Sequence, residues 1–201
     1  MKIIFASANK NKIAEIGLML EGKFEILGLK DIGIVEEIPE LGATIKENSF
    51  LKANYVFNFL KERNQPEIAV FADDSGLEVV ALNNAPGVHS ARYAGEPRND
   101  DNNNKKLLNE LNNITNRKAR FVTIITLIMN NKVQYFEGEI KGTVGYEAKG
   151  YSGFGYDPLF IPRGYRSTIA ELGAKVKNTI SHRALAVKQM VALLENINPI
   201  I

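Results

Sequence analysis

The sequence predicts an α/β protein, in which helices pack against a β-sheet. The apolar run Lys2–Ala6 passes through a short polar stretch into residues with helical apolar spacing that ends at Leu20. A second apolar run, Ile68–Phe71, ends in two acidic residues. The β-branched run Ala119–Met129 is followed by a turn and an alternating return strand, Val133–Ile140, which predicts a hairpin.

Composition restricts the possible classes of protein. The 201 residues form one domain, 1–201, or two lobes that share a core. A net charge of +2 gives no basic field for binding nucleic acid or anionic lipid. Without cysteine the chain has no disulfide, thiolate zinc site or cysteine nucleophile. No apolar run is long enough for a signal peptide or a membrane span, so we expect a cytoplasmic protein.

The stretch Val70–Leu77 combines an apolar run with two adjacent acidic residues, Asp73 and Asp74. Its apolar start predicts a buried strand that reaches the surface at Asp73 and Asp74, where open α/β sheets place ligand chemistry. Two neighbouring carboxylates repel each other, so a site that keeps both charged usually supplies a cation, and oxygen ligands suit Mg²⁺. The alternative is that Asp73, Asp74 and the following Ser75 and Gly76 merely form a turn.

The segment between the first strand and the first helix is a candidate phosphate site. A helix start offers N–H groups and the positive end of the helix dipole, and Lys10 and Lys12 add charge beside it. The spacing is not that of a P-loop. The alternative is an ordinary capped helix start with solvated lysines.

A second helix is predicted after Thr44, because Thr44 and Glu47 fit a capping box. It continues to Leu60. Lys52 lies on the same face as Asn48, four residues earlier. Glu40, just before the helix, is a candidate second metal carboxylate; the alternative is a solvated loop acid.

Other elements follow from shorter patterns. Asn99–Asn104 leads into a helix through Leu111, and we interpret this polar segment as surface without chemistry. The last helix spans about Ser181–Asn196. Strands are expected at Phe24–Leu27, Leu77–Leu82, Gly142–Ala148 and Leu159–Ile161.

Two late segments suggest recognition of a nucleotide base. Glycines around Phe154 allow close backbone approach to a ligand, and the ring offers a stacking face, although a purely structural turn is the alternative. Lys177, Ser181, His182 and Arg183 form a donor-rich set at a helix start. By contrast, His89 is interpreted as structural.

Together these stretches resemble the inosine triphosphate pyrophosphatase family over nearly the whole chain. The motifs that carry the resemblance occur in the family's order: Ser7-x-Asn9-x-x-Lys12, Glu40-x-Gly42, Glu47-Asn48, Lys52-Ala53, Ala72-Asp73-Asp74-Ser75-Gly76-Leu77, Pro86-Gly87-Val88, Ser90-Ala91-Arg92-Tyr93-Ala94-Gly95, Gly153-Phe154-Gly155-Tyr156-Asp157-Pro158, Lys177 and Ser181-His182-Arg183.

The resemblance implies a mixed, elongated β-sheet with flanking helices, two lobes around a central substrate groove, and a homodimer. It implies Mg²⁺-dependent hydrolysis of ITP, dITP and XTP to the monophosphate and pyrophosphate. Glu40 and Asp74 would hold Mg²⁺, and Asp74 would be the general base. The substrate-binding residues would be Ser7, Ala8, Asn9, Lys10, Asn11, Lys12, Lys52, Ser75, Phe154, Gly155, Tyr156, Asp157, Lys177, His182 and Arg183.

Two other functions remain to be separated by experiment. A pyrophosphatase for other modified bases is disfavoured by Phe154 and the Lys177–Arg183 donors. A module that binds nucleotides or single strands without hydrolysis is disfavoured by the near-neutral charge and by the paired acids. The spacing of Asp73 and Asp74 is not the Asp-x-Asp of haloacid-dehalogenase-type phosphatases.

Overall fold

The computed structural model describes residues 1–65 and 68–197, which form a mixed β-sheet with flanking helices. The strand order is β2-β1-β3-β4-β5-β6. Strand β1 pairs in parallel with β2 and β3, and β5 pairs antiparallel with β6. The predicted fold class is therefore confirmed. The strands are β1 Lys2–Phe5, β2 Glu25–Leu27, β3 Ala69–Val79, β4 Lys118–Met129, β5 Lys132–Val144 and β6 Phe160–Pro162.

The helices begin at polar caps. Thr44 accepts a hydrogen bond from the Glu47 N–H and Glu47 bonds back, so the predicted capping box is present. The α-helices are α1 Lys10–Leu20, α2 Ile45–Lys61, α3 Asp100–Glu110, α4 Ile169–Ile180 and α5 His182–Ile197. No helix in the described part of the chain is long and apolar enough to cross a membrane.

Helix α4 was not predicted from the sequence. Its capping box, Thr168 with Glu171, was a local signal for a helix start. The helical pattern is interrupted at Gly173, whose φ of 78° kinks the helix. Each half is therefore too short to show a convincing period on its own.

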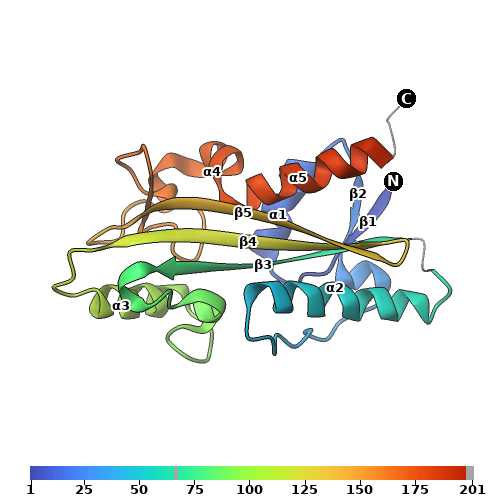
Figure 1. The fold of residues 1–201 in the computed structure, drawn as a ribbon, viewed down its shortest axis with the longest axis horizontal. Coiled ribbons are helices and arrows are strands. Elements are labelled where there is room, and N and C mark those ends of the chain that lie inside the picture. The colour runs from blue at the N-terminus through green and yellow to red at the C-terminus, as the bar shows by residue number, and fades with distance from the viewer. Residues whose placement is uncertain (66–67, 198–201) are drawn as a thin grey trace. The chain divides into compact units, whose positions relative to one another are not determined.

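The chain divides into two compact units. Unit 1 comprises 1–74, 124–137 and 186–201, and unit 2 comprises 75–123 and 138–185. In unit 1 the two faces of the sheet carry separate apolar clusters. One joins Ile3, Phe5 and Phe71 to α1 and α5, and the other joins Ile4 and Val70 to α2. Helices α1 and α5 thus cover one face and α2 covers the other (Figure 1).

The core of unit 2 is a third cluster. Leu77 and Val79 of β3 and Phe121 of β4 belong to it, with Leu107 of α3 and Ile169 of α4. These contacts fix α3 and α4 to the strand segments that belong to unit 2.

Strand β3 is longer than predicted, and the predicted break at Asp73 and Asp74 is wrong. Both residues lie within the strand and are buried, with 1% and 7% of their surface exposed. Strand β3 lies between β1 and β4 in the sheet and continues beyond Phe71, where its pairing with β1 ends, so its place in the sheet outweighs the turn preference of Asp, Ser and Gly. The expected separate strands at Leu77–Leu82 and Gly142–Ala148 are likewise not separate: β3 ends in a 3₁₀ turn, Val80–Leu82, and β5 runs on to Val144.

Candidate active site

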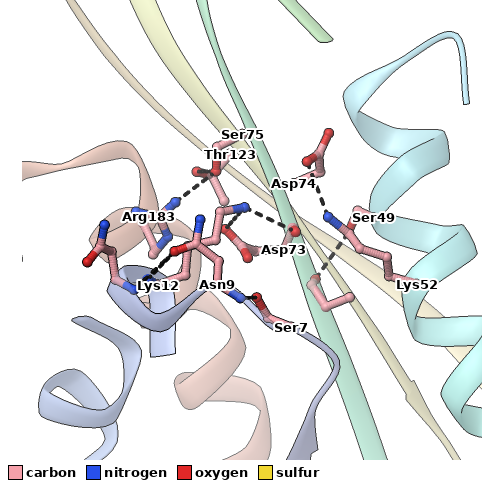
Figure 2. Close-up of polar contacts among 12 residues, drawn as sticks. Ser7, Asn9, Lys12, Ser49, Lys52, Asp73, Asp74, Ser75, Thr123 and Arg183 are labelled. Atoms are coloured by element: carbon pink, nitrogen blue, oxygen red, sulfur yellow. Dashed lines mark hydrogen bonds and ion pairs between the residues drawn. The ribbon is translucent and has the colours of Figure 1, made fainter. Parts of the chain in front are cut away.

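In unit 1, Asp73 and Asp74 point to opposite faces of β3, as consecutive residues of a strand must (Figure 2). Asp73 faces α1, where Lys12 Nζ lies 3.1 Å from its Oδ2 atom. Asp74 faces α2, where Lys52 Nζ lies 3.3 Å from its Oδ1 atom. Each buried acid therefore has its own lysine, delivered by a different helix.

Lys52 also reaches the loop before α2. Its Nζ atom lies 2.5 Å from Glu40 Oε1, so one ammonium group bridges Glu40 and Asp74. The resemblance implied that Glu40 and Asp74 hold a metal ion together. In the structure both carboxylates contact the Lys52 ammonium. The candidate second carboxylate is thus not merely a solvated loop acid.

Burial and charge act differently on the two partners. Burial raises the pKa of the Asp74 carboxyl above its ordinary value, even though Lys52 and Lys12 oppose this shift. Burial alone would lower the pKa of Lys52, but the charges of Asp74, Glu40 and Asp73 raise it above its ordinary value. Three carboxylates thus keep Lys52 charged, while the ionised form of Asp74 remains costly.

Glu40 is positioned by contacts between its loop and the start of α2. The Gly42 N–H donates to Asn48 Oδ1 at 2.7 Å, and the Ala43 N–H donates to Glu47 Oε2 at 2.7 Å. A Cβ atom on Gly42 would lie 2.7 Å from the Glu47 Cβ and 2.9 Å from the Asn48 backbone nitrogen. Only glycine allows this close approach.

The predicted phosphate segment is the N-cap of α1. The Asn9 side chain accepts hydrogen bonds from the N–H groups of Asn11 and Lys12, at 3.0 and 3.2 Å. Two of the helix-start donors expected to be open are therefore already bonded to this cap. Ser7 Oγ accepts from the Asn9 N–H, while Ala8, Lys10 and Asn11 are exposed.

In unit 2, Arg183 and Ser75 are joined across 108 positions in the sequence. Arg183 is only 1% exposed, and its Nη2 atom donates to Ser75 Oγ at 3.1 Å (Figure 2). Ser75 Oγ also bonds Thr123 Oγ1 at 2.7 Å. The His182 ring stacks on Phe121 with centroids 4.7 Å apart, so its faces are part of the core of unit 2.

The Gly-rich segment of unit 2 carries Phe154 beside two cations. Lys177 Nζ lies 4.3 Å from the Phe154 ring centroid and 2.5 Å from Asp157 Oδ2. The guanidinium of Arg183 lies 5.7 Å from the same centroid. The structure thus brings together Phe154, Asp157, Lys177 and Arg183, and their role in binding a base stays a prediction.

Two residues of this segment have roles within the protein. Tyr156 is buried, its OH donates to the Ser90 carbonyl at 2.9 Å, and burial raises the pKa of its phenol. Gly153 has a φ of 86°, and a Cβ there would collide with the Asp157 carboxylate. Tyr156 and Gly153 therefore have structural roles in this turn.

The carboxylates of Glu40 and Asp74 in unit 1 are the groups that would hold the Mg²⁺ that the resemblance implies. Within residues 1–65 and 68–197, no group of three or more histidine or acidic side chains is arranged to hold a metal ion. Mg²⁺ does not need such a cage, because it is usually held by one or two carboxylates together with substrate phosphates and water. Glu40 and Asp74 supply two carboxylates that share the Lys52 ammonium, so they fit this requirement.

Several buried polar residues of these clusters were not predicted. Ser49 donates to the Ala72 carbonyl at 3.1 Å and bonds Thr126 at 2.8 Å, next to the two acids. Asn103 and Asn104 are buried, so the interpretation of Asn99–Asn104 as surface is wrong for them. The only sequence signal was an Asn-rich segment at a helix start, which equally suits a solvated cap.

The fold and these two clusters of charged groups define a member of a known family of α/β proteins. A family model described as "Ham1 family" matches residues 3–193, and the chain belongs to this family. The resemblance noted from the motifs is thereby confirmed.

Similar proteins match over nearly their whole length. A protein of Porphyromonas gingivalis named dITP/XTP pyrophosphatase is 52% identical over 94% of this chain and 95% of its own. One of Flavobacterium johnsoniae with the same name is 50% identical over 96% of this chain and 98% of its own. The solved structure of the Staphylococcus aureus Ham1 protein is 37% identical, with a TM-score of 0.87, covering 98% of this chain and 100% of its own.

Proposed function

We propose that this chain hydrolyses the non-canonical purine nucleoside triphosphates ITP, dITP and XTP to the monophosphate and pyrophosphate. The enzyme class, a nucleoside triphosphate pyrophosphatase, is supported by the similar proteins of P. gingivalis and F. johnsoniae, both named dITP/XTP pyrophosphatase. One observation in the structure carries the chemistry: Asp73 and Asp74 are buried on opposite faces of β3, each beside its own lysine.

In this proposal the groups of unit 1 bind the phosphates and activate water. Lys12 and Lys52 offer positive charge to the polyphosphate, together with the turn Ser7–Asn11. Glu40 and Asp74 would hold Mg²⁺, which neutralises charge that develops on the phosphates in the transition state. Asp74 accepts a proton from the attacking water, a role favoured by a carboxyl whose pKa is raised above its ordinary value.

The groups of unit 2 bind the base and the substrate's remaining polar groups. Phe154 stacks on the purine, with Gly155, Tyr156 and Asp157 shaping the turn that carries it. Lys177, His182 and Arg183 donate to the 6-oxo edge, and Ser75 contacts the substrate. Donors opposite a 6-amino group would be left unpaired, so adenine is rejected.

The proposal includes a cytoplasmic homodimer that takes nucleotides and not nucleic acids. Sedimentation equilibrium tests the dimer, with a mass of about twice 22.3 kDa expected. A monomer at micromolar concentration would contradict the proposed dimer and leave the proposed reaction untouched.

Turnover is tested by pyrophosphate release from ITP and XTP against ATP, with and without Mg²⁺. Equal release from ATP would contradict the proposed base specificity.

A further inference from the structure

The start of helix α3 binds the turn that carries Phe154. Asp100 Oδ2 accepts a hydrogen bond from the Gly155 N–H at 2.7 Å, and Asn104 Nδ2 donates to the Gly155 carbonyl at 3.0 Å. Asp100 and Asn104 are four residues apart, so they lie on the same face of the helix. One helical turn therefore holds both backbone polar groups of a single glycine.

No neighbouring atom of the described residues packs against the Cα atom of Gly155 on the side where a Cβ would lie. Its φ is 62°, and a Cβ there would meet no atom within 4 Å. Asn104 is 8% exposed, so its bond to Gly155 is largely shielded from water. The bond from Asp100 is charge-assisted, which makes it stronger than a bond between neutral groups. These two hydrogen bonds thus hold the two peptide groups on either side of the Gly155 Cα atom.

The Asp100 contact bears directly on Phe154, while the Asn104 contact holds the next peptide group, between Gly155 and Tyr156. The Phe154 N–H donates to Asp157 Oδ2 at 2.8 Å, and the next N–H along the chain donates to Asp100. Both peptide groups that flank Phe154 are therefore held by carboxylates. Because the Cα–Cβ direction follows from these two peptide planes, the position of the ring depends on them.

We propose that Asp100 and Asn104 are positioning residues that hold Phe154 in place to stack on the substrate base. This inference rests on the proposed function, because Phe154 is the proposed stacking residue. Neither residue needs to touch the substrate. Loss of either contact would leave the charged groups of unit 1 unchanged, so binding would weaken more than the chemical step.

The first experiment compares KM and kcat for ITP in Asp100→Ala, Asp100→Asn and Asn104→Ala. We expect KM to rise about tenfold in both alanine variants, with kcat within about twofold of the unchanged protein, which corresponds to losing one partly buried hydrogen bond. Asp100→Asn keeps an acceptor oxygen and should restore most of the affinity. Asp101→Ala, an exposed acid in the same helical turn, is the control and should change neither constant.

The second experiment needs no substrate and separates this inference from the proposed function. Hydrogen exchange of the Gly155 amide should be at least about tenfold faster in Asp100→Ala than in the unchanged protein or in Asp101→Ala. If the unchanged protein hydrolyses no triphosphate, the proposed function fails, while exchange still reports whether Asp100 holds the turn. Unchanged exchange, or a fall in kcat with unchanged KM, would overturn the inference.

Discussion

The Lys52 ammonium lies 3.3 Å from the Asp74 carboxylate, with Glu40 on its other side at 2.5 Å. In the structure as it stands, a lysine therefore occupies the position between the two carboxylates proposed to hold Mg²⁺. Loss of Lys52 would leave two carboxylates without their shared cation, whereas loss of the Asp74 charge would leave Lys52 paired with Glu40. The predictions below start from this pair.

Replacing Asp74 by asparagine should remove activity and stabilise the fold. Loss of a general base costs about 10²–10⁴-fold in kcat. The pKa of Asp74 is raised above 3.8 in the folded protein, so its ionised form costs folding free energy at neutral pH. In chelator at pH 7 the melting temperature of Asp74→Asn should exceed that of the unchanged protein.

The stability gain of Asp74→Asn should shrink as the pH falls through the raised pKa of Asp74 and be gone below 3.8, because Asp74 is then neutral in the folded and the unfolded chain alike. Thermal melts at several pH values measure this trend. Near-normal turnover in Asp74→Asn would remove Asp74 from the role of base, and a lower melting temperature at pH 7 would contradict the energetic argument.

Replacing Lys52 by methionine should destabilise the metal-free protein by about 3 kcal/mol, because it leaves two carboxylates without their shared cation. The pKa of Lys52 is raised above 10.5, so its contribution is present below that pH and is lost as the pH rises beyond it. Urea unfolding in chelator measures the difference, which should stay constant from about pH 7 to pH 10 because this range lies below 10.5. Lys61→Met, at an exposed position of the same helix, is the control, and equal losses in both variants would refute a special role for Lys52.

Replacing Gly153 by alanine should weaken nucleotide binding more than the same change at Gly164. Both glycines have positive φ, 86° and 89°, so both substitutions carry a similar backbone penalty of about 1 kcal/mol. Only at Gly153 would the new Cβ collide with Asp157, which pairs with Lys177. We expect KM for ITP to rise at least about tenfold in Gly153→Ala and to change little in Gly164→Ala. Similar KM values in both variants would show that Gly153 is needed only for its positive φ and not to leave room for Asp157.

Replacing Lys177 by methionine should reduce the preference for ITP over ATP by at least about tenfold, because a donor to the 6-oxo group is lost. The ratio of kcat/KM values is measured within each variant, so a smaller folded fraction does not affect it. Lys175→Met, at an exposed position of α4, is the control. An unchanged ratio in Lys177→Met would assign base reading to other residues.

Much of the unit 1 cluster could be predicted from the sequence, because its residues follow directly from local patterns. Lys12 lies in the first turn after a strand, and Lys52 lies two turns after a capping box. What could not be predicted was how the chain buries them. Asp73 and Asp74 carry strong turn signals, yet they lie inside β3, a strand in the interior of the sheet. That is a tertiary effect, and no local pattern encodes it.

The unit 2 contacts were harder to predict for a similar reason. Arg183 meets Ser75 from 108 positions away, and Asp100 meets Gly155 from 55 positions away. Such partners are brought together by the packing of α3 and α5 with the strands and are not set by spacing. Helix α4 escaped prediction because the kink at Gly173 divides its periodic pattern.

The most direct test of the account is pyrophosphate release from ITP, XTP, ATP and GTP by the unchanged protein, with Mg²⁺ and with chelator. We expect fast release from ITP and XTP, loss of release in chelator, and little release from ATP. Binding of ITP in Mg²⁺ without any release of pyrophosphate would contradict it, and would make the protein a nucleotide-binding module instead of a pyrophosphatase.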